Sequence, residues 1–558
     1  MFSKLLIANR GEIAVRVART CKDLGVATVA VYSDADEGAR HTRICDEAVH
    51  LPGTASSATY LNIPALVGAA ESVGASAVHP GYGFLSENAA FAAAVMGAGL
   101  VWVGPPPDAL RAVGDKISAR RIAESAGVPI VPGLLEPVGA PALVADFAAE
   151  HGFPVAVKAA GGGGGRGLKV AHDPDEIEEA FTGARREALA YFDDDRVYVE
   201  RYLTSPKHLE VQIVAPAPDQ ALWLGVRDCS LQRRHQKLIE ETPPARLAVP
   251  AAELGRAAVA LSSAVGYVNA GTVEMLVDQS GFYFLEVNAR LQVEHTVTEE
   301  IFGVDLVAAQ LRIAAGDQLG FTQSDLEERG HAIECRINAE DPARGFIPTP
   351  GWLTHYIEPS GPGVRVDSGF GPGDEISGAY DSLLAKVICT GSNRDQARAR
   401  MLRALDEMEI EGVASTVAAQ RLLLQEPSFV DGSHSTTTVE ASGVLDSLIA
   451  AGADAAPAEG VVLVEGRPAS LWNPAMAASA TAAVPRGLSM GDVIAPMQGT
   501  VLKLWVSEGD AVKTGDPMIV LEAMKMESTI DAARDGNVRL HVDTGTSVSA
   551  GQLLAVIE

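Results

Sequence analysis

An internal repeat in the last seventy residues constrains the fold of this chain more than any other feature. Glycine and glutamate recur at matching intervals in two consecutive segments, first at Gly499, Gly509, Gly515 and Glu522 and then at Gly536, Gly545, Gly551 and Glu558. The stretch TVLKLWV parallels NVRLHV, and PMIVLE parallels LLAVIE. Two similar strand–turn–strand halves, with glycines at turns that need positive φ, predict one small all-β module.

The segment between the two halves reads Ala-Met-Lys-Met-Glu-Ser and is expected to form an exposed hairpin with Lys525 at its tip. A lysine in such a place is usually a solvated charge. Here Met524 and Met526 flank it, and exposed apolar side chains are costly unless another molecule binds them. The pattern therefore predicts that Lys525 is presented to a partner or modified.

The rest of the chain indicates several packed domains. In the first hundred residues, short apolar strands such as KLLIAN and VATVAVYS alternate with helical patterns, which predicts a parallel, doubly wound α/β domain. Later strands are rich in Val, Leu and aromatic residues. The expected divisions are a Rossmann-like domain (1–115), a second α/β domain with a glycine-rich loop (116–330), a mixed α+β domain (331–446), an Ala/Pro-rich linker or small docking element (447–488) and the all-β module (489–558).

Composition excludes several classes of partner. With 44 basic and 72 acidic residues the net charge is −28, which argues against nucleic acid and anionic membranes. The five cysteines are scattered without a CxxC pair, as expected of reduced thiols in a cytoplasmic protein. No signal peptide or membrane-spanning stretch is evident in the sequence.

The glycine run Gly161–Gly167, interrupted only by Arg166, lies between two strand-like stretches, with Lys158 just before it. A flexible linker is the ordinary explanation of such a run. A hairpin of bare backbone N–H groups beside lysines can instead close over a triphosphate. No GxxxxGK[ST] motif occurs, so a Walker-type site is not expected.

Two glutamates, Glu274 and Glu286, fall on apolar strands joined by a turn around Ser280. Facing acids repel unless a cation lies between them, and Mg²⁺ carried with ATP fits, with Asn288 as a further oxygen donor. Two acids facing water remain the alternative. We expect the strand to continue, with Arg290, Gln292 and Glu294 on the same face.

A basic stretch, Gln232–Lys237, stands out in this acidic chain. It is either a solvated loop or a receptor for small anions, and the acidic background favours the receptor.

These motifs together resemble the biotin carboxylases, which are ATP-grasp enzymes with a Rossmann-like first domain. The resemblance covers residues 1–446 and is carried by LLIANRGEIAVR, AVHPGYGFLSEN, GGGGGRG, RRHQK, EVNARLQVEH and HAIECRINAEDP. Residues 489–558, with AMKM at the hairpin, resemble a biotin carboxyl carrier domain of the barrel-sandwich type. The fusion is similar to alpha subunits of two-part actinobacterial acyl-CoA carboxylases.

The resemblance implies roles for individual residues. Nucleotide contacts are expected from Lys116, Lys158, Gly163, Gly164, Gly165, Gly167, Glu200, Leu203, His208, Gln232 and His235. The metal is expected at Glu274, Glu286 and Asn288, and bicarbonate at Lys237, Arg290, Gln292 and the backbone of Val293. Glu294 matches the general base, and Arg336 the arginine beside the biotin ring. Lys525 matches the biotin-attachment residue.

The implied reaction uses ATP, bicarbonate and Mg²⁺ (or Mn²⁺) to carboxylate biotin on Lys525. The implied partners are a carboxyltransferase beta subunit on a separate chain, a biotin protein ligase and a second copy of the carboxylase part. The acceptor stays open among acetyl-, propionyl- and longer-chain acyl-CoA and pyruvate. Two other hypotheses remain, a carrier with an inactive ATP-grasp half and a different ATP-grasp ligase. The intact Lys237, Glu294 and Arg336 disfavour the first, and the biotinyl hairpin disfavours the second.

Overall fold

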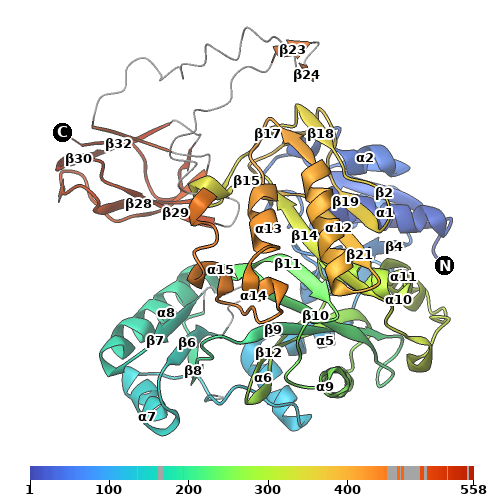
Figure 1. The fold of residues 1–558 in the computed structure, drawn as a ribbon. Coiled ribbons are helices and arrows are strands. Elements are labelled where there is room, and N and C mark those ends of the chain that lie inside the picture. The colour runs from blue at the N-terminus through green and yellow to red at the C-terminus, as the bar shows by residue number, and fades with distance from the viewer. Residues whose placement is uncertain are drawn as a thin grey trace.

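The computed structural model describes residues 1–134, 136–160, 167–192, 194–448, 462–464, 467–469, 491–495, 499–523, 526–548 and 552–557. Figure 1 shows a large body built from the first 448 residues and a small β module beside it. Within the described residues no helix is both long and apolar enough to cross a membrane.

The N-terminal part is the predicted parallel sheet, with strand order β3-β2-β1-β4-β5. Its strands are β1 (Lys4–Ile7), β2 (Ala27–Tyr32), β3 (Glu47–His50), β4 (Ala77–His79) and β5 (Val101–Trp102). Its helices are α1 (Gly11–Asp23), α2 (Arg40–Ile44), α3 (Ile63–Ser72), α4 (Ala89–Gly97), α5 (Pro107–Gly114) and α6 (Lys116–Ser125). Leu5, Leu6 and Ile7 are fully buried, as expected of a strand covered on both faces.

A small lobe follows, in which β7 (Leu168–Ala171), β6 (Val155–Ala159) and β8 (Val197–Arg201) form an antiparallel sheet. Helices α7 (Pro141–His151) and α8 (Ile177–Phe192) pack on its valines. The strands predicted on either side of the glycine run are therefore confirmed. Residues 161–166, which include Gly163, Gly164 and Gly165, lie outside the described residues.

The largest element is an antiparallel sheet of eight strands, in the order β13-β12-β9-β10-β11-β14-β21-β19. The strands are β9 (Lys207–Ala215), β10 (Leu222–Arg233), β11 (Gln236–Thr242), β12 (Asn269–Asp278), β13 (Gly281–Asn288), β14 (His331–Asn338), β19 (Val364–Ser368) and β21 (Leu383–Gly391). Because β11 pairs with β14, one sheet runs across the division expected at residues 330 and 331.

Helices cover this sheet and connect its strands (Figure 1). They are α9 (Ala251–Ala264), α10 (His295–Phe302), α11 (Leu306–Ala314), α12 (Arg394–Glu407), α13 (Val417–Leu423), α14 (Pro427–Val430) and α15 (Thr438–Ala441). Six short strands, β15 (Glu340–Asp341), β16 (Ile347–Pro348), β17 (Gly351–Trp352), β18 (His355–Ile357), β20 (Glu375–Ile376) and β22 (Glu409–Glu411), pair around the third part.

The C-terminal module confirms the predicted repeat as a pair of four-stranded sheets, β25-β32-β30-β27 and β29-β28-β26-β31. Its strands are β25 (Asp492–Ile494), β26 (Gly499–Leu504), β27 (Ala511–Val512), β28 (Pro517–Ala523), β29 (Met526–Asp531), β30 (Gly536–Leu540), β31 (Ser547–Val548) and β32 (Leu553–Ile557). In each sheet the two inner strands come from one half of the repeat and the two outer strands come from the other half, so the two halves interlock. Lys525 itself lies outside the described residues, between β28 and β29, which pair antiparallel up to Ala523 and Met526.

Most of the linker expected at 447–488 lies outside the described residues. The described part contains an antiparallel strand pair, β23 (Val462–Val464) and β24 (Arg467–Ala469).

One close contact between α9 and β10 gives a prediction about stability. A Cβ added at Gly255 would lie 2.4 Å from the Trp223 ring, whereas one added at Gly68 of α3 meets nothing within 4 Å. We expect Gly255→Ala to destabilise the protein by about 1–3 kcal/mol through overpacking. Gly68→Ala, the matched helical control, should stabilise it by about 0.5–1 kcal/mol, because alanine favours helix. Chemical denaturation of both variants measures these changes in the free energy of unfolding. Equal gains in stability would contradict the prediction, because the Trp223 ring would then move away from the added methyl group without a loss of stability.

Candidate active site

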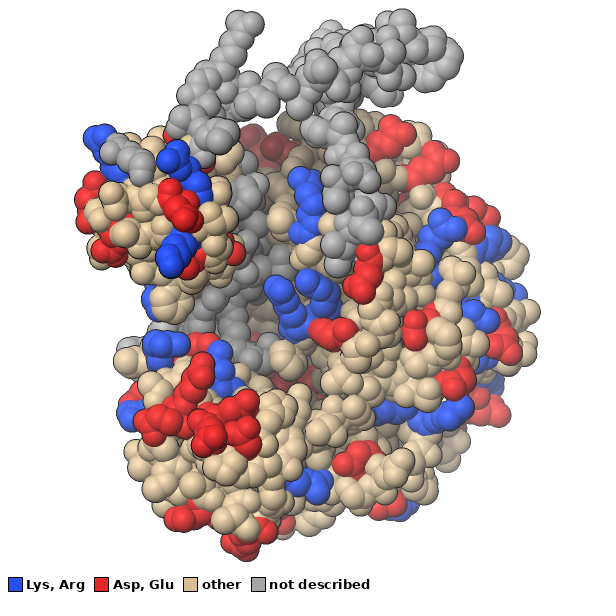
Figure 2. All heavy atoms as spheres, turned by 60° about the vertical axis from the view of Figure 1, so that its left-hand side comes forward, with Lys and Arg blue, Asp and Glu red and all other residues tan. Residues whose placement is uncertain are grey.

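Most of the predicted site residues line one cavity of about 1520 Å³ in the body. These residues are Lys116, Lys158, Glu200, Leu203, His208, Gln232, His235, Lys237, Glu274, Glu286, Asn288, Arg290, Gln292, Val293 and Arg336. Figure 2 shows Lys and Arg side chains gathered around the central hollow of this face, although the chain as a whole is acidic. Gly167 packs against Ala159 behind the cavity, and Glu294 is fully buried beneath its wall.

Glu294 is held between two cations that come from neighbouring strands. Its Oε1 lies 2.6 Å from Lys237 Nζ of β11, and its Oε2 lies 2.8 Å from Arg336 Nη2 of β14. Burial would raise the pKa of Glu294, but Lys237 and Arg336 outweigh it and hold that pKa well below its usual value. The carboxylate is therefore ionised and fixed at both oxygens.

Lys237 contacts three carboxylates at once. Besides Glu294, its Nζ lies 2.8 Å from Glu210 and 2.9 Å from Glu274. All three donors of the ammonium are thereby used. Burial would lower the pKa of Lys237, but the acidic groups around it raise it well above its usual value, so the lysine stays charged.

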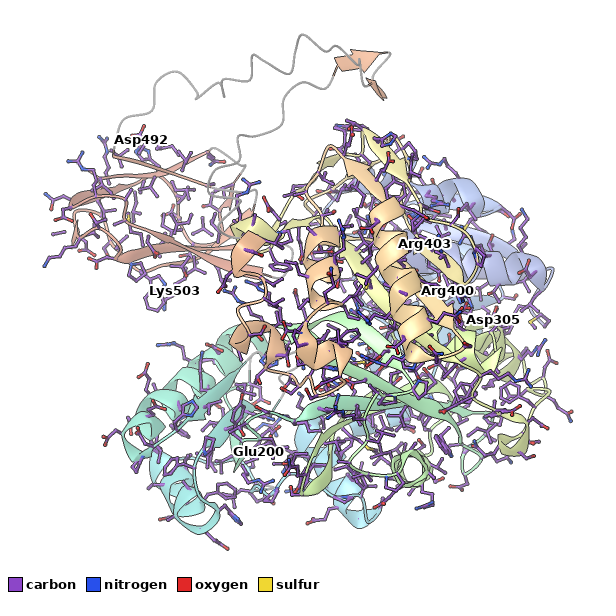
Figure 3. All side chains as sticks on the ribbon, viewed as in Figure 1. Glu200, Asp305, Arg400, Arg403, Asp492 and Lys503 are labelled. Atoms are coloured by element: carbon purple, nitrogen blue, oxygen red, sulfur yellow. The ribbon has the colours of Figure 1, made fainter. Side chains whose placement is uncertain are left out.

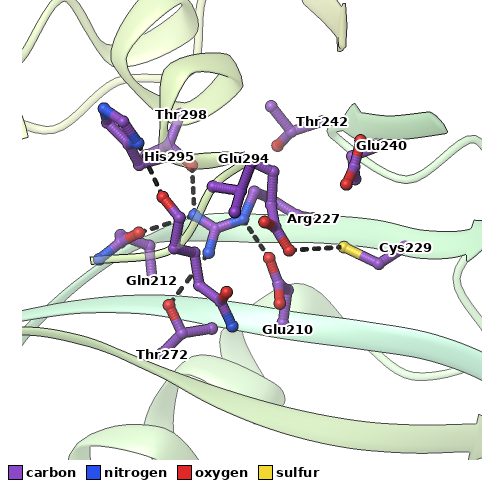
Figure 4. A network of polar contacts seen from close by, with 12 residues as sticks. Glu210, Gln212, Arg227, Cys229, Glu240, Thr242, Thr272, Glu294, His295 and Thr298 are labelled. Carbon is purple, nitrogen blue, oxygen red and sulfur yellow. Dashed lines mark hydrogen bonds and ion pairs between the residues drawn. The ribbon is translucent and has the colours of Figure 1, made fainter. Parts of the chain in front are cut away.

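Arg227, which no motif in the sequence indicated, stabilises the cluster of charged residues around Lys237 through Glu210. It is fully buried in β10 and pairs with Glu210. It also donates to Gln212 Oε1 at 2.7 Å, Thr298 Oγ1 at 2.9 Å and Thr272 Oγ1 at 3.0 Å (Figure 4). Arg227 therefore ties the middle of the sheet to α10, the helix that begins after Glu294.

The two glutamates among the three predicted metal ligands face each other as expected. Glu274 pairs directly with Glu286 across β12 and β13. Glu286 lies 3.0 Å from Lys116 Nζ, and Asn288 accepts a hydrogen bond from Arg290 at 2.9 Å. The buried Asn288 Nδ2 has no partner among the described residues. This group of oxygen donors fits a hard cation such as Mg²⁺.

The continuation of that strand was predicted wrongly. β13 ends at Asn288, and residues 289–294 form a connection to α10. Arg290 nonetheless turns back to the same place, where it donates to Gln292 at 2.8 Å and lies 3.2 Å from Glu87. The polar side chains meet because this connection bends, and not because they share a strand face.

The nucleotide candidates come from two elements that meet at the cavity. In the small lobe Lys158 pairs with Glu200, which also pairs with Arg120 of α6 (Figure 3 labels Glu200). In the large sheet, His208 Nε2 lies 3.0 Å from Glu274 Oε2. Burial lowers the pKa of His208, but Glu274 outweighs it, so the net shift is upward.

The basic stretch Gln232–Lys237 is the hairpin that joins β10 to β11. Arg234 and His235 occupy its tip with φ of 47° and 65°. Burial lowers the pKa of His235, which keeps its ring uncharged at neutral pH. The alternative of a solvated basic loop therefore does not describe the whole stretch, because Gln232 is buried and Lys237 points into the charged cluster.

Several supporting residues were missed although the sequence carries a signal for them. Glu210 and Gln212 were not predicted, although together with the predicted His208 they alternate with apolar residues along β9, as expected of a polar face inside a sheet. Glu240 pairs with Arg336 at 2.5 Å and is fully buried. Burial and repulsion by Glu294 raise the pKa of Glu240 to about 7, despite the nearby Arg336.

The triple contact of Lys237 gives a prediction. Lys237→Met leaves Glu210, Glu274 and Glu294 without their shared cation, and we expect a loss of about 3–5 kcal/mol of stability at neutral pH. In the wild type the pKa values of Glu274 and Glu294 are lowered, so their contribution is lost as pH falls below about 4.5. In the variant burial raises these pKa values, so stability falls as pH rises from 5 to 8.

Denaturation midpoints across that pH range measure this difference. Lys4→Met, which breaks the partly exposed Lys4–Glu47 pair, is the control and should show no such trend. Parallel pH profiles for wild type and Lys237→Met would contradict the prediction.

Comparison with known proteins assigns these parts. Residues 1–110 match the N-terminal domain of biotin carboxylase and residues 334–441 its C-terminal domain. Residues 115–322 match the ATP-binding domain of the carbamoyl-phosphate synthase L chain. Residues 491–557 match the family described as biotin-requiring enzymes.

Two relatives that match all or most of this chain support these assignments. The biotin-dependent acyl-coenzyme A carboxylase alpha3 subunit of Mycobacterium leprae is 44% identical over 100% of this chain and 98% of its own length. The biotin carboxylase of Nostoc is 47% identical over 79% of this chain and 99% of its own.

Solved structures support the same assignment. The biotin carboxylase domain dimer of Hydrogenobacter thermophilus 2-oxoglutarate carboxylase, in complex with MgADP, ADP and bicarbonate, is 41% identical, with a TM-score of 0.77 over 80% of this chain and 99% of that one. Biotin carboxylase from Campylobacter jejuni is 39% identical, with a TM-score of 0.76 over 79% of this chain and 99% of that one. The expected cofactors biotin, ATP and Mg²⁺ agree with these relatives. The chain belongs to the biotin carboxylase family and joins that ATP-grasp enzyme to a biotinyl domain on one polypeptide.

Proposed function

We propose that this chain carboxylates biotin carried on its own Lys525, using ATP and bicarbonate, as the alpha subunit of an acyl-CoA carboxylase. The observation that carries the proposal is Glu294, a buried ionised carboxylate fixed by Lys237 and Arg336 beside a cavity that also contains the metal and nucleotide candidates. A base, an anion receptor and a phosphate-binding region within one enclosure are what the reaction needs.

We assign nucleotide binding to the lobe and the adjoining edge of the sheet. Lys116, Lys158 and His208 supply positive charge, and Glu200, held by two cations, and Leu203 complete the pocket with Gln232 and His235. Gly163, Gly164, Gly165 and Gly167 stay our candidates for contacts with the phosphates. Glu274, Glu286 and Asn288 would hold Mg²⁺, which offsets the charge on the phosphates of ATP.

Bicarbonate is assigned to the bend after β13. Arg290 and Lys237 provide charge, while Gln292 and the backbone of Val293 provide hydrogen bonds. Glu294 would then accept the bicarbonate proton, so that the anion attacks the γ-phosphate of ATP. Arg336, on the other side of Glu294, is placed to stabilise negative charge on the biotin ring.

The division into five parts remains our proposal for the domain plan, with boundaries at residues 115, 330, 446 and 488. The linker of roughly forty residues would reach over 100 Å when extended, enough to move Lys525 between two sites. We further propose a biotin protein ligase as the modifying enzyme and a homodimer of the carboxylase part.

The second half-reaction is assigned to a separate carboxyltransferase chain, with acetyl- or propionyl-CoA as acceptor. The support is the similarity to a protein named an acyl-coenzyme A carboxylase alpha subunit. We also propose that the protein is located in the cytoplasm, because all five cysteines are free and buried, as expected in a reducing compartment.

Transfer of radiolabel from bicarbonate onto the purified, biotinylated chain tests the central proposal. ATP-dependent label that avidin blocks is the expected result. If no label appears although biotin is confirmed on Lys525, the result would favour the alternative of a carrier with an inactive ATP-grasp half.

We predict that Lys525→Ala abolishes capture by avidin and leaves ATP hydrolysis stimulated by free biotin intact. The change removes the attachment amine and leaves every described residue that lines the cavity unaltered. Lys503→Ala on the same module is the matched control and should still be captured (Figure 3 labels Lys503). Avidin binding that persists in Lys525→Ala would exclude Lys525 as the attachment site.

We predict that Glu294→Gln lowers bicarbonate-dependent ADP release by about 10² or more, because the amide keeps the shape but cannot accept the proton. Glu241→Gln is the control, since Glu241 is equally buried but pairs with His331 and Arg394 outside the cavity. Turnover near the wild-type value in Glu294→Gln would remove Glu294 from the base role.

A further inference from the structure

Lys386 is a fully buried lysine to which the proposed reaction gives no role. It lies in the middle of β21, between the buried residues Ala385 and Val387. Charged side chains are almost never fully buried unless they are paired. Its contacts therefore need an explanation.

Two contacts of Lys386 join three parts of the chain. Its Nζ lies 2.9 Å from Glu12 Oε1 of α1 and donates to the carbonyl oxygen of Val293 at 2.8 Å. Tyr82, which lines the cavity, donates to the same Glu12 oxygen. Lys386 thus connects the parallel-sheet domain, the third part and the connection that carries the proposed bicarbonate pocket.

The position of Lys386 in the sheet places it next to the proposed catalytic residues. It is the direct cross-strand neighbour of Arg336 on one side and of Asp367 on the other. Directly opposed residues have side chains on the same face of a sheet. The Lys386 side chain therefore lies on the same face of the sheet as the side chain of Arg336, which contacts Glu294.

The carbonyl that Lys386 binds belongs to the peptide that carries Glu294. That peptide leads directly into α10, of which Glu294 is the N-cap. The peptide before it is held as well, because the Gln292 carbonyl oxygen lies 2.8 Å from His295 Nδ1. Apart from Lys386, the side-chain contact described for the backbone of residues 292–294 comes from His295.

We propose that Lys386, held in place by Glu12, is a positioning residue that fixes the Val293 peptide and thereby aims Glu294 and the bicarbonate-binding backbone. This inference rests on the proposed function of the same site. Tyr82 and Lys386 both contact Glu12. These contacts therefore also connect the cavity wall of the first domain to the proposed bicarbonate pocket. A simple stabilising ion pair between domains is the alternative.

The test uses the full biotinylated chain and the double variant Lys386→Met/Glu12→Gln. Both charges are removed together, so no buried charge is left without its partner. Glutamine can still accept from Tyr82, and Asp367 keeps Arg365 at 2.7 Å. Arg394→Met/Glu241→Gln is the matched control, a buried pair that does not contact residues 292–294.

We expect the double variant to raise the KM for bicarbonate by about tenfold or more and to lower kcat, because small displacements of a reacting group are costly. The KM for ATP should stay within about twofold, and the control pair should stay near wild type in both. A purely structural role would change both KM values together or neither, and either result would overturn the proposal.

A crystal structure of the double variant gives a readout that does not depend on activity. We expect the Val293 carbonyl to turn and Glu294 to leave Lys237, while an unchanged 292–294 backbone would overturn the inference. Failure of the proposed function itself would appear separately, as wild-type protein without bicarbonate-dependent ADP release.

Discussion

The ion pairs of Glu294 with Lys237 and Arg336 are the interaction on which the site depends. Each cation comes from a different strand, β11 and β14, and each is held by a second carboxylate, Glu210 or Glu240. A buried carboxylate is stable only where such partners are already in place. The order of the central strands is thus what allows the site to exist, and a shift in register between β11 and β14 would separate the cations.

This requirement explains why one sheet crosses the expected domain division. If the ATP-grasp part ended as a separate unit at residue 330, Arg336 would belong to a different body from Lys237 and could move relative to it. Pairing of Ile239 with Cys335 and of Glu240 with Glu334 removes that freedom. Lys386, one strand further along, extends the same rigid frame to α1. The small lobe with Lys158 forms a sheet of its own, so these strand pairings do not fix the nucleotide side as they fix the carboxylate side.

Local patterns in the sequence predicted the elements and the facing pairs, whereas the convergence of distant site residues on one cavity was implied only by the family resemblance. The parallel sheet, the interlocked repeat and the facing Glu274 and Glu286 follow from periodicity and turn residues, which are local properties. The path after Asn288 was predicted wrongly because alternation continues through Arg290, Gln292 and Glu294 although the strand does not. Lys386 gave a signal, a lysine within an apolar strand, but its partners Glu12 and Val293 are far away in sequence.

The lowered pKa of Glu294 has a consequence for how a base in this position works. A carboxylate held by two cations is a weak proton acceptor, since protonation must break both ion pairs. An anion that enters the cavity competes for Lys237 and adds negative charge beside Glu294. In the proposed reaction both effects would raise the pKa of Glu294, so that its basicity would increase when bicarbonate binds. The site as described here keeps the carboxylate ionised and fixed at both oxygens, and the bound anion would make it reactive.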